Sequence, residues 1–206
     1  MNTKTARLVL FVLVIAAVGF GFLRYHLSFK TVYIDIKHPG VSVTIYNSKK
    51  KQVTALPASG KLSLKTGKYS VVPGGTNIST KAIPLTVNET GAYLTVDPGY
   101  SQAYLNQLLQ GEIGDIKAVI TSTYPNAISD FSINTGSLYT YGDWYATTLV
   151  QNPPGPGASG DVYRTVLHKV QDKWQVAATP AIALSVKEYP HIPKPVLDSI
   201  NKQTGY

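Results

Sequence analysis

The stretch Val-Ser-Val-Thr-Ile-Tyr, residues 41–46, alternates apolar and polar side chains. Successive side chains of a β-strand point to opposite faces, so this alternation predicts a strand with one buried face. The polar residues from Asn47 to Lys51 follow it and predict a tight turn. The first half of the chain is therefore expected to be built from strands.

Similar short runs lie on both sides of this strand, and turn residues separate them. They occupy residues 32–36, 62–64, 69–72, 83–87 and 93–96. Short alternating runs without helical periodicity are typical of a small antiparallel β-sandwich. We expect an all-β domain over residues 31–98 with about seven strands.

Two motifs in this region resemble a known family. Residues 39–43 read Pro-Gly-Val-Ser-Val, and residues 64–71 read Leu-Lys-Thr-Gly-Lys-Tyr-Ser-Val. Together they resemble the PEGA domain of bacterial surface proteins, with its P-x-G-A-x-V opening strand and later L-x-P-G-x-Y-x-V turn and strand. The chain departs from that pattern because Pro-Glu and a later Asp-Gly are missing and Thr66 replaces a proline. The resemblance implies a prealbumin-like sandwich that acts as a non-catalytic spacer or binding module.

The second motif also has a direct physical reading. Gly67 is expected to take a turn conformation that a side chain would resist. Tyr69 and Val71 are two residues apart, so they are expected on the same face of the following strand.

The pattern changes at Asp97-Pro98-Gly99, which predicts a boundary before a second domain, residues 99–206. A helix is expected to begin after Ser101 as N-cap and to end at Thr123, before Pro125. Its apolar side chains follow helical spacing and are Leu105, Leu108, Leu109, Ile113, Ile116 and Ile120. Gly111 and Gly114 leave open a kink or a split into two helices.

Longer strands are expected after this helix, over residues 128–140, 144–150, 162–170 and 174–185. Residues 151–161 hold three prolines and three glycines and predict a loop. Pro195 can open a short terminal helix with Val196, Leu197 and Ile200 on its apolar side. One helix followed by a curved antiparallel sheet resembles cystatin-like or NTF2-like α+β domains in pattern and length. Such a fold would leave a concave sheet face for a site.

An uncharged stretch of sixteen residues, Leu8–Leu23, lies between Arg7 and Arg24. As a helix it would be about 24 Å long, slightly less than the roughly 30 Å core of a bilayer. The flanking arginines can extend to the two interfaces, and Tyr25 suits the interfacial region. Residues 1–30 are therefore expected to form a cytoplasmic tail, a transmembrane anchor in the lipid bilayer and a short linker.

The short basic tail with Lys4 and Arg7 is easiest to retain in the cytoplasm, which places the rest of the chain outside. The alternative is a cleaved signal peptide, with Leu8–Ala16 as its apolar region and small residues at Ala17 and Gly19. Both interpretations place residues 31–206 outside the cytoplasm. The protein is expected at the cell membrane or, after cleavage, secreted.

The chain contains no cysteine, which excludes disulfides, thiolate metal sites and a cysteine nucleophile. A cysteine-free exported protein fits a bacterial envelope better than a eukaryotic secretory route. Residues 31–98 carry eight lysines against three acidic residues, a net charge of +5, whereas residues 99–206 are near neutral at −1. This basic surface suits anionic headgroups or wall polymers, and export argues against nucleic acid as the partner.

The densest aromatic cluster of the chain surrounds one carboxylate. It consists of Tyr139, Tyr141, Asp143, Trp144 and Tyr145. Aromatic rings beside a carboxylate can stack on a sugar and hydrogen-bond its hydroxyls, so these residues are a candidate contact for wall glycan. The alternative is that the rings fill the core, since aromatics favour strands, and that Asp143 is a turn residue.

No catalytic, cofactor or metal site is expected. His168 shares a predicted strand face with Arg164 and Val166, and an ordinary surface histidine is its simplest interpretation. Ser48-Lys49-Lys50-Lys51 and Lys65-Thr66-Gly67 match two penicillin-binding-enzyme motifs. We reject the match because both lie in turns of one small sandwich.

The sequence therefore predicts a single-pass, membrane-anchored envelope protein that is not an enzyme and that contacts proteins or other envelope components. A wall-glycan-binding module is the first alternative. An enzyme of unrecognised type in residues 99–206 is the second.

Overall fold

The structure is a computed structural model that describes residues 18, 28–127, 129–152 and 160–204. Apart from residue 18, the predicted anchor Leu8–Leu23 lies outside the described residues, as does most of the predicted loop. Within the part of the chain that is described, no helix combines the length and apolarity needed to cross a membrane.

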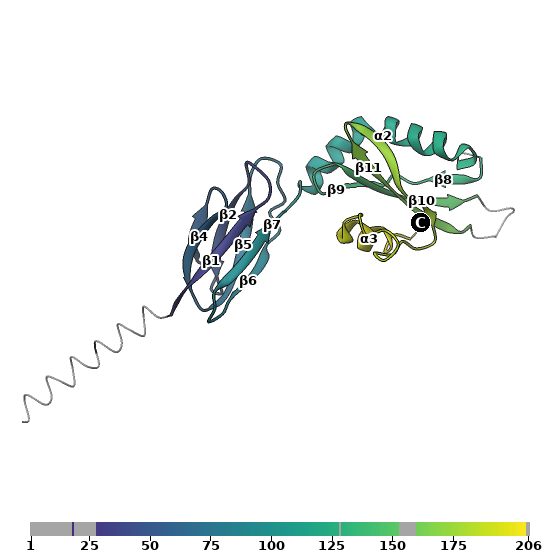
Figure 1. Ribbon diagram of the computed structural model, residues 1–206. Helices are drawn as coiled ribbons and strands as arrows, with labels where there is room; N and C mark the ends of the chain where they lie inside the picture. The colour runs from purple at the N-terminus through teal and green to yellow at the C-terminus, as the bar shows by residue number, and fades with distance from the viewer. Residues whose placement is uncertain (1–17, 19–27, 128, 153–159, 205–206) are drawn as a thin grey trace, which may run out of the picture. The chain divides into compact units, whose positions relative to one another are not determined.

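The chain divides into two compact units, with the boundary between Pro98 and Gly99. The described residues are mostly β, with three sheets and the two α-helices α2 and α3 (Figure 1).

The first unit contains seven strands. They are β1 (Phe29–Ile36), β2 (Ser42–Asn47), β3 (Gln52–Leu56), β4 (Gly60–Lys65), β5 (Gly67–Gly74), β6 (Ile83–Val87) and β7 (Ala92–Val96). Strands β4, β1 and β7 form one sheet in that order, and β3, β2, β5 and β6 form the other. Strand β3 was not predicted, because its side chains are exposed or half-buried and it lacks a strong apolar alternation.

A single apolar core joins the two sheets of this unit, as expected for a sandwich. The alternation that predicted β2 is confirmed, because Val43 and Ile45 are fully buried while Thr44 between them is not. The buried side chains of this core are Val32, Ile34, Val43, Ile45, Leu64, Val71, Leu85, Val87 and Val96.

The prediction of a wholly antiparallel sandwich is wrong for one strand pair. Strands β1 and β7 pair in parallel, with Val32 opposite Ala92 and Ile36 opposite Val96. Parallel neighbours need a long connection, and β1 and β7 are the first and last strands of the unit. All the intervening strands supply that connection.

Gly67 behaves as the sequence predicts. It begins β5 with φ at 152°, a conformation that residues with a side chain rarely adopt. Tyr69 and Val71 both pack against the core of the unit, which confirms that they share a face. The hydroxyl of Tyr69 donates a hydrogen bond to the carbonyl oxygen of Lys65 at 2.9 Å and closes the turn.

In the second unit, α2 (Gln102–Thr123) is one continuous helix, so neither glycine splits it. The side chain of Ser101 caps it by accepting a hydrogen bond from the N–H of Tyr104 at 3.4 Å. The helix ends before Pro125, as predicted, and the 3₁₀ turn η1 (Pro125–Ala127) follows.

Five antiparallel strands follow: β8 (Phe131–Ile133), β9 (Ser137–Tyr139), β10 (Trp144–Gln151), β11 (Val162–Val170) and β12 (Lys173–Ala181). Their order is β12, β11, β10 and β8, and β9 pairs with another part of β10. The prediction of one long strand over residues 128–140 is wrong, because β8 and β9 are separate short strands. Between these two strands, the side-chain amide of Asn134 donates a hydrogen bond to the hydroxyl of Thr148 at 2.8 Å.

Helices cover both faces of this sheet (Figure 1). Leu109, Ile116 and Ile120 of α2 pack on one face. Helix α3 (Lys194–Ile200) packs on the other through Val196, Leu197 and Ile200, which confirms the predicted apolar side of the terminal helix. The sheet therefore has an apolar, packed layer on each side, where the sequence had suggested an open concave face.

Candidate functional site

A groove lies where α2 ends above the sheet of the second unit. The helix ends at Thr123, and the N–H of its C-cap residue Tyr124 still donates to the carbonyl oxygen of Ile120 at 2.9 Å. Pro125 has no N–H to continue the helix, so the chain turns through η1 towards β8. Strands β10, β11 and β12 form the opposite wall of the groove through Leu149, Tyr163 and Pro180.

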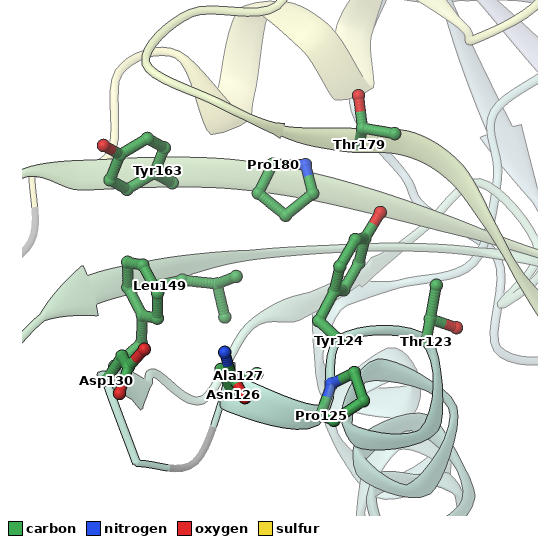
Figure 2. A pocket seen from close by; sticks show the side chains of 11 residues that line it. Thr123, Tyr124, Pro125, Asn126, Ala127, Asp130, Leu149, Tyr163, Thr179 and Pro180 are labelled. Carbon is green, nitrogen blue, oxygen red and sulfur yellow. The ribbon is translucent and has the colours of Figure 1, made fainter.

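The groove has a volume of about 720 Å³ (Figure 2). Its lining is Thr123, Tyr124, Pro125, Asn126, Ala127, Asp130, Phe131, Leu149, Tyr163, Thr179 and Pro180. Binding pockets in this size range are mostly apolar and carry a few polar groups that fix orientation. The aromatic rings and prolines here match that composition.

Contacts among the lining residues and with a neighbouring residue fix some of the side chains of the groove. Phe131 and Tyr163 pack edge to face with their ring centroids 5.6 Å apart. The hydroxyl of Thr179 lies 3.2 Å from that of Tyr189, which supports the β12 side of the groove. The rings are therefore positioned by neighbours before any ligand arrives.

The polar groups of the groove suit hydrogen bonding. Asp130 is the one carboxylate among the lining residues, and its Oδ1 accepts from the hydroxyl of Ser129 at 2.7 Å. Burial, with a smaller contribution from Tyr189, raises the pKa of Tyr124 above its ordinary value, so its hydroxyl stays protonated at neutral pH. The groove thus offers a carboxylate, hydroxyls and an apolar floor, an arrangement that can bind an apolar segment bearing hydrogen-bond donors.

The sequence did not reveal this groove. Its residues come from the end of α2, from η1, from β8 and from three further strands, which are far apart in the sequence. Among them, only Thr123 and Pro125 were named as predicted features, the first as the end of the helix and the second as the residue that stops it. A periodic pattern cannot reveal which strands lie opposite that helix end.

The aromatic cluster predicted as a glycan contact is divided between the two faces of the sheet. Tyr145 is fully buried in the core beneath α2, and its hydroxyl accepts from the N–H of Gly136 at 3.0 Å. Trp144 is buried in the core beneath α3 and stacks on His168, with ring centroids 4.0 Å apart and the planes 11° from parallel. These two rings therefore fill the two cores.

Tyr139 also serves packing. It contacts the α3 core, and its hydroxyl lies 3.0 Å from that of Ser199 in α3. The other two predicted residues, Tyr141 and Asp143, are half-buried in the turn between β9 and β10. Gly142 of that turn has φ at 86°, which agrees with the turn interpretation of Asp143.

Tyr141 and Asp143 line a second hollow of about 430 Å³ together with Glu112 and Lys169. The Tyr141 ring packs edge to face on Tyr100, with centroids 5.3 Å apart. The carboxylate of Asp143 accepts hydrogen bonds from the hydroxyl of Thr140 and from the N–H of Tyr141. This hollow is more polar than the groove, and the sequence placed two of its residues together.

Within the described ranges, which omit residues 1–17, 19–27, 128, 153–159 and 205–206, no group of three or more histidine and acidic side chains is arranged to hold a metal ion. The histidine singled out by the sequence, His168, is half-buried against Trp144. The His168 ring therefore takes part in side-chain packing against an aromatic ring.

Comparison with protein-family models, with curated proteins and with solved structures yields no match to this chain.

Proposed function

We propose that this chain is a single-pass, membrane-anchored protein of the bacterial envelope whose two units act outside the cytoplasm without catalysing a reaction. The uncharged segment Leu8–Leu23 supports the anchor, and the basic residues Lys4 and Arg7 before it support its orientation. The second unit would bind an apolar segment of a partner protein. The groove of about 720 Å³ carries this proposal.

The chemistry of the groove favours a protein segment as its occupant. Burying aromatic and aliphatic surface contributes roughly 25 cal/mol per Å² of apolar area, so the lining rewards an apolar side chain. Asp130 at the same groove can accept hydrogen bonds from backbone N–H groups or a basic side chain of the partner. Peptide recognition commonly combines these two features.

We also propose that the first unit is a prealbumin-like sandwich of the PEGA kind, which spaces the second unit from the membrane. Two packed sheets support this proposal, as does the turn at Gly67 that leads into Tyr69 and Val71. For the second unit we propose a cystatin-like or NTF2-like domain, supported by a long helix followed by an antiparallel sheet.

Cysteine labelling tests the proposed location, because the natural chain has no cysteine to react. Lys49→Cys and Lys187→Cys each place one thiol at an exposed position, one in each unit. Both are expected to react with a membrane-impermeant maleimide on intact cells. Thr5→Cys, in the N-terminal tail, is expected to react only after the membrane is opened. Labelling of Thr5→Cys on intact cells, with protection of the other two, would reverse the proposed orientation.

A blocked groove tests the binding role. Thr179 is exposed on β12 and lines the groove, so Thr179→Trp fills the hollow from its rim. Gln175→Trp adds the same ring at an exposed position of β12 outside the groove and is the matched control. The natural full-length chain, purified from envelope fractions, is expected to bring a bound partner with it. The Thr179→Trp variant should lose this partner, and the Gln175→Trp variant should keep it. Equal retention by both variants would remove the groove from the proposal.

A wall-glycan-binding function is the second candidate, favoured by the hollow that Tyr141 and Asp143 share. Tyr141→Ala should then weaken co-sedimentation with purified peptidoglycan by about tenfold, the loss typical of one aromatic stacking partner. Tyr139→Ala is the comparison, because Tyr139 packs on the α3 core away from this hollow. Undiminished sedimentation of Tyr141→Ala would reject this candidate.

A further inference from the structure

Exposed tyrosines lie side by side on the outer face of the sheet formed by β4, β1 and β7. Tyr33 of β1 pairs directly with Tyr93 of β7, and their side chains are 47% and 66% exposed. The neighbours of Tyr33 along β1, Val32 and Ile34, point to the opposite face of the sheet and are buried. The two tyrosines therefore face away from the sandwich core.

A lysine extends this row across the third strand. Lys61 of β4 lies opposite Tyr33 on the other side of β1, and its Nζ is 5.4 Å from the centroid of the Tyr33 ring. Lys61, Tyr33 and Tyr93 thus form one line across three strands, which we call the tyrosine row. A cation over a ring face leaves the ammonium at the surface, where it can meet an anion.

Beside the tyrosine row lies a hollow of about 470 Å³. Thr31, Asn88 and Thr90 contribute hydroxyl and amide groups to its lining. Gly91 allows the turn to approach β1: it has φ at 96°, and a Cβ there would lie 2.2 Å from the carbonyl oxygen of Thr31. The hollow is consequently built by a close approach of two backbones that a side chain would prevent.

A hydrogen bond holds one ring of the row, and the unit that carries the row is basic. The Tyr93 hydroxyl donates to Oδ2 of Asp35 at 2.9 Å, which holds the second ring in place. The negative charge of Asp35 is offset by Lys37, whose Nζ lies 2.7 Å from the same oxygen. Residues 31–98 as a whole carry a net charge of +5.

We propose that the tyrosine row and its hollow bind an acidic polysaccharide, one that carries carboxylate groups on its sugar rings. Exposed tyrosine rings offer flat surfaces for the apolar faces of sugars. The hydroxyls and amide of Thr31, Asn88 and Thr90 can bond sugar hydroxyls, and Lys61 can pair with a carboxylate. An anionic membrane could take up the lysine and the tyrosine rings at its interface, so it is the hydroxyl and amide groups gathered in the same hollow that favour the polymer.

The test uses the full-length chain in detergent micelles and polygalacturonate as the acidic polysaccharide. Neutral dextran, polyglutamate and vesicles of phosphatidylglycerol are the comparison probes, which separate sugar rings, charge and lipid. We expect polygalacturonate to bind, with affinity falling as salt rises, and the other probes to bind at least about tenfold more weakly.

Matched variants locate the site. Tyr93→Ser and Tyr33→Ser should each weaken polygalacturonate binding by about fivefold to tenfold, whereas Tyr93→Phe keeps the ring but loses the hydrogen bond to Asp35 and should weaken binding less than Tyr93→Ser does. Lys61→Gln should weaken binding, and Lys49→Gln, the same charge change in the turn after β2, should have at most a small effect.

Three results would overturn the proposal. The first is unchanged binding by both tyrosine-to-serine variants. The second is equal binding of polyglutamate, which would mean that the site recognises negative charge and not sugar rings. The third is equal or tighter binding to the vesicles, which would make this face a membrane contact. Thr179→Trp, which blocks the groove of the second unit, should leave polygalacturonate binding unchanged. Failure of the groove and failure of the tyrosine row are therefore distinguishable.

Discussion

The ammonium of Lys169 lies 2.7 Å from Oε1 of Glu112, and this ion pair joins strand β11 to helix α2. The indole N–H of Trp174 donates to Oε2 of the same carboxylate, also at 2.7 Å. Both oxygens of Glu112 are thus engaged by the sheet. Among the described contacts, this carboxylate is a polar link between the helix and the two strands that lie beside it.

Glu112→Gln should destabilise the second unit by about 1–2 kcal/mol at pH 7, because the charge-assisted hydrogen bonds are only partly screened by solvent. Urea unfolding followed by tryptophan fluorescence measures this selectively, since both tryptophans of the chain, Trp144 and Trp174, belong to the second unit. Glu188→Gln, at an exposed position, is the control and should change stability little.

The same carboxylate makes stability depend on pH. The hydrogen bond from Lys169, helped by the one from Trp174, lowers the pKa of Glu112 below its ordinary value of 4.5. A lowered folded-state pKa contributes stability that is present above the unfolded-state value and is lost as the pH falls through the folded-state value. The difference in unfolding free energy between the natural chain and Glu112→Gln should therefore be constant near neutral pH and shrink below about pH 4.5. A difference that grows on acidification would contradict this assignment.

Arg164 should hold the C-terminal segment on the sheet. Its guanidinium donates to the carbonyl oxygens of Ile200 at 3.1 Å and Gln203 at 2.8 Å, and also to that of Ile182. Arg164→Lys keeps the charge but loses the planar fork, so a loss of about 1–3 kcal/mol is expected. Hydrogen exchange of residues 194–203 should accelerate in this variant, and unchanged exchange there would show that apolar packing alone retains α3.

Two glycine substitutions should act in opposite directions. A Cβ on Gly136 would lie 2.2 Å from the carbonyl oxygen of Ala146 and 2.6 Å from Cζ of Tyr145, so Gly136→Ala should cost about 1–3 kcal/mol. Gly111 is exposed on α2 and has open space around it, so Gly111→Ala should stabilise the helix by about 0.5–1 kcal/mol. Thermal unfolding of the two variants compares them directly, and a stabilised Gly136→Ala would refute the close contact.

Tyr145→Phe should expose the cost of one buried hydrogen bond. The Tyr145 hydroxyl is the partner of the Gly136 N–H, and burial raises the pKa of this tyrosine. Removing the hydroxyl leaves the N–H without that partner, for an expected loss of about 1–3 kcal/mol. Tyr163→Phe, at a half-buried ring, is the control for loss of a hydroxyl and should change the unfolding free energy less.

Much of the fold could be read from local patterns. Val43 and Ile45 are buried as their alternation predicts, and Leu105, Leu109, Ile116 and Ile120 of the predicted helix stripe are all buried. Strand β3 was missed because its side chains are exposed or half-buried and show little apolar contrast along the strand. The split between β8 and β9 was missed because it depends on another strand. Asn134, which lies between β8 and β9, forms hydrogen bonds with Thr147 and Thr148 of β10.

The candidate site was harder to predict than the fold. Trp144 and Tyr145 are sequence neighbours, and the two-residue period of a strand already implies that they point to opposite faces. A cluster defined by sequence proximity therefore joined rings that belong to different cores. Tyr141 and Asp143 share a hollow because they lie in a turn, where this period no longer applies.

By itself the sequence determined the strand and helix periods, the helix stop at Pro125 and the turn at Gly67, because these depend on residues within a few positions of each other. Tertiary structure decided which elements meet. Glu112 and Lys169 are 57 residues apart, and Tyr33 and Tyr93 become neighbours through a parallel pairing of the first and last strands of their unit. Such contacts depend on how sheets pair and pack, and that arrangement is a property of the whole core and of no single segment.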